Sequence, residues 1–238
     1  MGCKSFIIIS LISVIAITSA TSAEISPGEY RQLRREKAAR PRRVLFNNDA
    51  ADSRGNFTRE EFLARRTDFT VGLVDTIMYC VGHAGFQQVV ALPHGETSAY
   101  LKTVDVFQWL IDFAHANGQE VFCSFRMNDV HDWRHTEAKP RMSSWKKANR
   151  DVLFADSMEN KTTLYGFWTA MDYGNAKVRD QHFAIVCDVL DKYDVDGLDF
   201  DFSRYLPLFR EVSMRVPASP EQREQFTDLM RRIRRNLQ

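Results

Sequence analysis

The sequence predicts an α/β fold with a parallel sheet, because short apolar stretches alternate with segments of helical periodicity. Three such stretches occupy residues 43–49, 75–82 and 120–127, and a fourth, acidic one lies within 193–204. Polar residues follow each stretch, at the edge where parallel α/β folds place their sites. Neither a G-x-G-x-x-G fingerprint after the first stretch nor a P-loop occurs, which argues against a nucleotide site.

The remaining elements are predicted from caps and from spacing. A capping-box pattern starts a helix at Thr58, and an amphipathic pattern predicts a helix over 99–116. Residues 165–171 are apolar and favour a short strand. Residues 176–193 and 220–237 carry apolar side chains at helical spacing, so each segment is expected to be a helix with one apolar face.

The N-terminus has the layout of a secretory signal peptide. A lone Lys4 precedes an apolar run from Phe6 to Ile17, and small residues follow. We therefore expect a signal peptide over 1–23, a basic N-terminal arm over 24–42 and one domain over 43–238. The expected location is secreted or periplasmic, and no membrane anchor is expected after cleavage.

Composition excludes several kinds of partner. Residues 24–238 hold 31 basic and 31 acidic side chains, so no strong field draws the protein to nucleic acid. The three cysteines of that segment, Cys80, Cys123 and Cys187, lie far apart within apolar stretches, and buried free thiols are expected. Histidines are not spaced as metal-ligand pairs, so neither a metal nor another cofactor is expected.

The acidic stretch is the most informative part of the chain. Side chains alternate along a strand, so Asp199, Asp201 and Ser203 share one face, whereas Leu198 and Phe200 share the other. Paired acids on a buried parallel strand are costly unless a ligand, a cation or water meets them. The alternative is an antiparallel edge strand with its polar face in solvent.

Three motifs resemble secreted glycosyl-hydrolase-like TIM barrels. Residues 125–131 resemble the end of the third strand of such barrels, and 171–179 are similar to a helix start of glycosyl-hydrolase-like family 10. Residues 196–203 resemble, more distantly, the acidic signature of chitinase-like hydrolases, but Ser203 stands where that signature has its catalytic Glu. The resemblance spans 43–204 and implies a TIM (β/α)8 barrel, without a chitinase mechanism.

This resemblance implies roles for the acidic strand. Glycoside hydrolysis uses one carboxylic acid at the leaving oxygen and one carboxylate as nucleophile or base. Asp201, nearer the end of the strand, is the candidate acid or acid/base, and Asp199 is its deeper partner. Arg126 and Asn128 fit contacts to sugar hydroxyls, but a buried Arg–Asp pair explains them equally well. The other candidate substrate-binding residues are Asn48, Asp49, Asp129, His131 and Arg204, of which Asp129 and His131 also fit loop caps.

The strand count limits the extent of the barrel. A complete barrel takes about 250 residues for eight units, whereas this sequence supplies four core strands, so only the first half is expected in an apparently truncated chain. Open strand edges would then favour self-association. The expected function is that of a glycoside hydrolase acting on a polysaccharide or oligosaccharide. Two alternatives stay open: a non-catalytic carbohydrate-binding relative and an inactive truncated gene product.

Overall fold

The computed structural model describes residues 27–83, 87–136, 142–157, 163, 166–205 and 207–237. The chain divides into two compact units, Met1–Arg40 and Pro41–Gln238. In the first unit, the described part of the predicted arm is a helix, α1 (Pro27–Ala39). The predicted signal peptide lies outside the described residues. Among the helices that the structure describes, none is long and apolar enough to cross a membrane.

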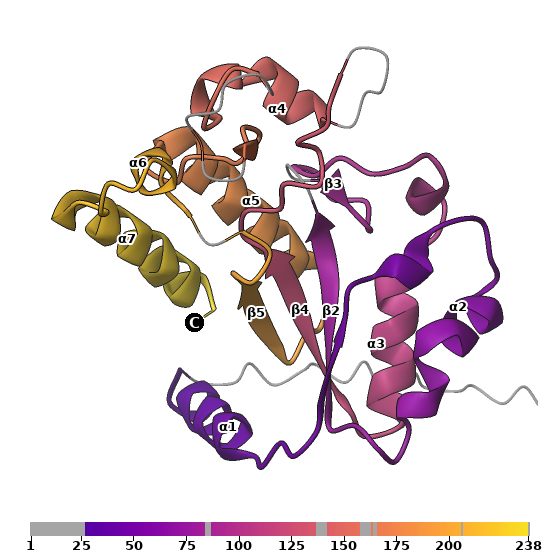
Figure 1. The fold of residues 1–238 in the computed structure, drawn as a ribbon. Coiled ribbons are helices and arrows are strands. Elements are labelled where there is room, and N and C mark those ends of the chain that lie inside the picture. Colours follow the sequence, from indigo (N-terminus) through magenta and orange to yellow (C-terminus); the bar gives the residue numbers. More distant parts are fainter. Residues whose placement is uncertain are drawn as a thin grey trace, which may run out of the picture. The chain divides into compact units, whose positions relative to one another are not determined.

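The second unit is built on a parallel sheet. Strands β1 (Leu45–Asn48), β2 (Thr76–His83), β4 (Glu120–Arg126) and β5 (Gly197–Asp201) lie side by side in that order, and β3 (Gln87–Gln88) pairs antiparallel with β2 (Figure 1). Neighbours in sequence are thus neighbours in space, as in consecutive units of a barrel. The acidic strand β5 runs parallel to β4, so the antiparallel alternative is wrong.

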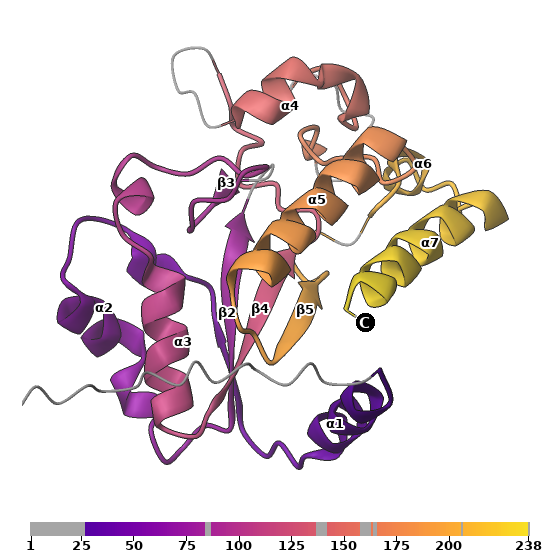
Figure 2. The same ribbon diagram turned by 180° about the vertical axis from the view of Figure 1, so that it is seen from behind.

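Helices cover one face of this sheet. Helix α5 lies behind β4 and β5 in Figure 1 and in front of them in Figure 2, which is the view from the other side. This helix therefore lies over a single face of the sheet. The helices of the second unit are α2 (Arg59–Arg66), α3 (Val106–Ala116), α4 (Ser144–Ala148), α5 (Ala176–Lys192), α6 (Arg210–Ser213) and α7 (Pro220–Asn236). The capping box predicted at Thr58 is present, with its hydroxyl accepting from the Glu61 amide.

The covered face is apolar and aromatic. The Tyr79 ring of β2 packs on Phe62 of α2 and Phe107 of α3, with ring centroids 6.2 and 5.8 Å away. Phe125 of β4 stacks on Phe200 of β5 at 6.1 Å. These side chains alternate along their strands with residues of the other face, as period-two patterning requires. The main core therefore lies between the sheet and its helices.

The opposite face of the sheet is less covered. It carries Leu45, which is 48% exposed, and Phe122, which is half-buried. The Arg42 guanidinium lies 5.4 Å from the Phe122 ring centroid. Gly197 faces this ring so closely that a Cβ there would lie 2.8 Å from it. In a closed barrel this face points to the interior.

Asp196 joins three elements at the N-terminal end of the sheet. Its Oδ2 accepts the backbone N–H of Val121, at the start of β4, at 3.0 Å. The same oxygen lies 2.9 Å from Nε2 of His115, in the last turn of α3. The residue therefore fixes the start of β5 at the edge of the sheet opposite to the polar strand ends.

Two predicted elements are wrong. The helix predicted over 99–116 begins at Val106, because the carboxylate of Asp105 accepts the amide of Gln108 and caps the helix there. The strand predicted over 165–171 is not formed within 166–171, where Met171 makes a single antiparallel bridge to Leu153. A short apolar run is compatible with any buried segment, and this one packs as a loop.

Candidate active site

The register of β4 and β5 brings the predicted site residues together. Ser124 stands opposite Asp199, and Arg126 stands opposite Asp201 one pleat further on. All four side chains lie on the face turned away from the helices, because Phe125 and Phe200 occupy the alternate positions. Two acids, one hydroxyl and one guanidinium therefore share one face at the C-terminal edge of the sheet, where parallel α/β folds place their sites.

Asp201 lies at the end of β5 and is only 12% exposed. Its Oδ1 accepts the Ser203 amide at 2.8 Å and the Ser203 hydroxyl at 2.5 Å. Its Oδ2 lies 3.8 Å from Nε of Arg204. Ser203 thus orients the carboxylate through Oδ1, while Oδ2 is directed to the cation.

Asp199 is the deeper of the two acids. Its Oδ2 accepts the hydroxyl of Ser124 at 2.6 Å, so a neutral donor from the neighbouring strand satisfies the carboxylate. Ser124 was not among the sequence candidates. Its position opposite Asp199 depends on the β4–β5 register, which the sequence does not specify by itself.

Arg126, Asp129 and His131 form a connected group after β4. Oδ2 of Asp129 accepts Nη1 of Arg126 at 3.1 Å, and Oδ1 accepts the His131 amide at 2.9 Å. Burial raises the pKa of Asp129, but hydrogen bonds from the His131 ring and amide, with Arg126, bring it well below the usual range. The hydrogen bond to Asp129 raises the pKa of His131, against burial and the Arg126 and Arg204 charges.

Asp49 extends the charged group to the end of β1. Its Oδ1 lies 2.7 Å from Nη1 of Arg66, which comes from the last turn of α2. Partial burial raises the pKa of Asp49, but the Ala51 amide, Arg66 and the charge of Arg126 lower it overall. Arg66 is not among the sequence candidates, because its position in the helical pattern is the same as that of an ordinary solvent-exposed arginine.

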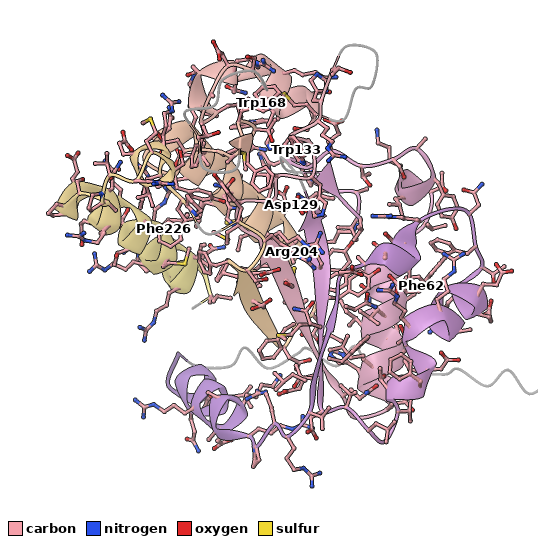
Figure 3. All side chains as sticks on the ribbon, viewed as in Figure 1. Phe62, Asp129, Trp133, Trp168, Arg204 and Phe226 are labelled. Carbon is pink, nitrogen blue, oxygen red and sulfur yellow. The ribbon has the colours of Figure 1, made fainter. Side chains whose placement is uncertain are left out.

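Two hollows open beside these charges. The first, of about 590 Å³, is lined by Phe46, Asn47, Asp49, Arg66, Phe69, Asp201, Ser203 and Arg204. The second, of about 740 Å³, has among its lining residues Ser53, Asn56, Gln88, Glu96, Ser98, Tyr100, Arg126, Asp129 and His131. Figure 3 shows Asp129 and Arg204 at the C-terminal end of the sheet. Both hollows present charged, polar and aromatic walls.

Gln88 lines the larger hollow and carries a buried acceptor without a partner. Its side chain is buried, and Oε1 has no hydrogen-bond partner among the residues that the structure describes. An unpaired buried amide oxygen costs free energy. The sequence offered no signal for this residue.

Two sequence candidates lie apart from the hollows. Asn48 is buried on the helix side of the sheet, where Nδ2 donates to Asp52 and Oδ1 accepts the Ala50 amide. Asn128 is buried as well, and its Nδ2 donates to the carbonyls of Met171 and Pro207. Both side-chain amides therefore make structural hydrogen bonds within the protein.

Metal ligands do not cluster in the part of the chain that the structure describes: no three His, Cys, Asp or Glu residues there could hold an ion together. The charges of the site are instead balanced by one another, with Arg126 on Asp129, Arg66 on Asp49 and Arg204 on Asp201.

Comparison with known proteins identifies the fold. No family model and no curated protein matches the chain. Among solved structures, α-L-fucosidase isoenzyme 2 from Paenibacillus thiaminolyticus is similar with a TM-score of 0.55 at 14% identity. The match covers 83% of this chain, which spans only 31% of that structure. At this identity the similarity shows a glycoside hydrolase-like fold.

Two further structures match at lower scores. An α-galactosidase from Thermus thermophilus has a TM-score of 0.46 at 15% identity, with 88% of this chain and 40% of that chain covered. A maltogenic α-amylase from Thermotoga neapolitana has a TM-score of 0.44 at 16% identity, with 72% and 42% covered.

Proposed function

We propose that the protein is a glycoside hydrolase that binds an oligosaccharide or polysaccharide at the C-terminal edge of its sheet, with Asp201 as the reacting carboxylate. The observation that carries this proposal is the position of Asp201 opposite Arg126, at the wall of a hollow and next to Arg204. The glycoside hydrolase-like fold supports it.

The arrangement suits carbohydrate chemistry for two reasons. A sugar ring presents several hydroxyl groups, and the hollows offer both charged acceptors, such as Asp49, and donors, such as Arg126 and Arg66. Aromatic walls, such as Phe46 and Tyr100, provide apolar surface for the faces of the ring. A carboxylate aimed into such a hollow stabilises positive charge that develops on the anomeric carbon.

The test is hydrolysis of a panel of nitrophenyl glycosides and of unmodified oligosaccharides by the purified chain. Asp201→Asn removes the charge and the proton exchange at nearly constant shape, so turnover should fall about 10²–10⁴-fold. Asp194→Asn, on the exposed loop before β5, is the matched control and should leave turnover unchanged. Wild-type turnover in Asp201→Asn would contradict the assignment.

A non-catalytic carbohydrate-binding protein is the second candidate. One observation favours it: Ser203, which stands where the resembling signature has its Glu, donates twice to Oδ1 of Asp201 and thereby occupies that oxygen. Binding of an oligosaccharide on a glycan array, with no product formed by the wild type on any member of the panel, would decide for this function.

The proposed location is secreted or periplasmic. It rests on the layout of residues 1–23, in which a charged start, a short apolar run and small residues follow one another. N-terminal sequencing of exported material should show a start near residue 24. An intact Met1 on membrane-bound protein would contradict it.

A further inference from the structure

A histidine and a buried carboxylate stand at the mouth of the larger hollow and have no role in the function proposed above. The Asp129 side chain is fully buried, whereas 69% of the His131 side chain is exposed. Oδ1 of Asp129 lies 2.5 Å from Nδ1 of His131. The contact occupies Nδ1, and among the described residues Nε2 has no hydrogen-bond partner, so Nε2 remains available to a ligand.

The carboxylate is held in place from three directions. Besides the ring contact, Oδ1 accepts the amide of His131, and Oδ2 accepts Nη1 of Arg126, whose side chain is only 6% exposed. All of these contacts favour an ionised carboxylate, and the pKa of Asp129 accordingly lies well below the usual range. Asp129 therefore stabilises a protonated imidazole and fixes its orientation, without exchanging a proton itself.

This division of roles is known chemistry. A buried aspartate that accepts from Nδ1 of a histidine holds the imidazole in one tautomer and stabilises the imidazolium, while Nε2 transfers the proton. The hollow at His131 provides the space that such a transfer needs, because the ring lines it together with Arg126 and Asp129.

We propose that His131 is the proton-transfer group of this site, with Asp129 and Arg126 as its positioning residues. The proposal rests on the proposed function. In the first step, Nε2–H of the imidazolium gives its proton to the glycosidic oxygen, the bond between this oxygen and the anomeric carbon breaks, and the electron pair stays on the oxygen. The carboxylate of Asp201, which lines the other hollow and stands opposite Arg126, stabilises the cationic sugar from there. Water then bonds to the anomeric carbon and returns a proton to Nε2.

The charges around His131 set the pH range of this chemistry. Asp129, Arg126 and Arg204 are the charged groups that act on the ring. The hydrogen bond to Asp129 raises the pKa of His131, and burial and the two arginines act in the opposite direction. The net increase extends the protonated form toward neutral pH, where a proton donor is required.

Nuclear magnetic resonance of the imidazole nitrogens tests the pair without any substrate. In the wild type, neutral His131 should carry its proton on Nδ1 and should titrate above an ordinary histidine. Asp129→Asn should lower that pKa and allow the other tautomer. A neutral ring with its proton on Nε2 overturns the proposal, and this result needs no variant, so a folding defect of Asp129→Asn cannot obscure it.

Hydrolysis of the same nitrophenyl glycosides tests the transfer itself. His131→Gln should reduce turnover at least 10²-fold, and Asp129→Asn should shift the basic limb of the pH profile to lower pH. His94→Gln, at an exposed histidine next to Asp188, is the control and should keep the wild-type profile.

The two proposals fail in different ways. If His131→Gln keeps wild-type turnover while Asp201→Asn loses it, His131 is not the proton-transfer group, and the proposed glycoside hydrolase function is retained. If the wild type hydrolyses none of the substrates, both the proposed function and the catalytic role of His131 are contradicted. The tautomer measurement still decides whether Asp129 accepts a hydrogen bond from Nδ1 of His131.

Discussion

Nζ of Lys146 lies 2.9 Å from Oδ2 of Asp132, and neither side chain reaches the solvent. The other carboxylate oxygen accepts the hydroxyl of Thr169 at 2.6 Å. This buried pair ties α4 to the chain that follows β4. Lys146→Met leaves the Asp132 charge buried without a cation, so the free energy of unfolding should fall by about 3–5 kcal/mol, as measured by urea denaturation.

The control for this pair is Lys177→Met. Lys177 and Asp151 lie 3.0 Å apart, but both side chains are more than half exposed. Water screens such a pair, so its loss should barely change the denaturation midpoint. Equal effects of the two substitutions would show that burial does not set the contribution of the Lys146–Asp132 pair.

A second prediction concerns Gly197, against which the Phe122 ring packs on the less covered face of the sheet. A Cβ at this position would lie 2.8 Å from the ring, so Gly197→Ala must displace it. The free energy of unfolding should fall by about 1–3 kcal/mol. In the background of Phe122→Leu, whose smaller side chain leaves room, the same change should cost less; an unchanged cost would exclude the ring as the cause.

Acid sensitivity should depend on His182. His182 lies in α5, and burial of its ring against Phe125 and Phe200 of the sheet lowers its pKa to about 4, so the folded protein keeps it neutral where an unfolded chain is protonated. As the pH falls from about 6.5 toward 4, the unfolded state gains a proton first and stability is lost. The total loss is roughly 3 kcal/mol.

His182→Phe should remove that contribution, because a phenyl ring fits among Phe125, Tyr173 and Phe200 and does not titrate. Urea denaturation at pH 7 and pH 4.5 should show a smaller difference for the variant than for the wild type. His94→Gln, at an exposed histidine, should retain the wild-type difference. The prediction is wrong if the three proteins lose stability in parallel.

Self-association should involve the edge of β1. Exposed apolar side chains gather on and near this strand: Val44, Leu45, Phe69, Val71 and Leu73. Exposed apolar side chains beside the edge of β1, which among the described strands pairs only with β2, favour association with another chain. Light scattering after size exclusion should show oligomers that Leu45→Lys with Leu73→Lys reduces. Met214→Lys, at an exposed residue that follows α6, should leave the mass distribution unchanged.

The sequence predicted the sheet better than the site. Apolar stretches and caps were sufficient for the four parallel strands and for α2, α5 and α7, since local spacing determines these elements. The alternation in 197–203 also correctly placed Asp199 and Asp201 on one face of β5. The position of Arg126 opposite Asp201, by contrast, depends on the register between strands that lie far apart in sequence.

Polar residues after the strands could not be sorted by type alone. Asn48 and Asn128 have the same chemistry as a sugar-binding amide, yet both are buried and satisfy backbone or carboxylate partners. From the sequence, Asp129 and His131 fit both ligand contacts and loop caps. In the structure, Asp129 caps the loop by accepting the His131 amide, and the His131 ring is exposed as well. Gln88 and Arg66 carry no local signal, because only the tertiary fold brings them to the hollows.

The hydrogen bonds of Asp196 make the acidic strand dependent on the neighbouring strand and on the helix that precedes that neighbour. Its carboxylate contacts Val121 and His115, so the first residue of the Asp-Gly-Leu-Asp-Phe-Asp stretch serves the far end of the sheet. Transplanting this stretch into another parallel sheet would therefore carry the Asp201 carboxylate but leave Asp196 without its donors. A functional graft would have to include the last turn of the preceding helix and the start of the neighbouring strand as well.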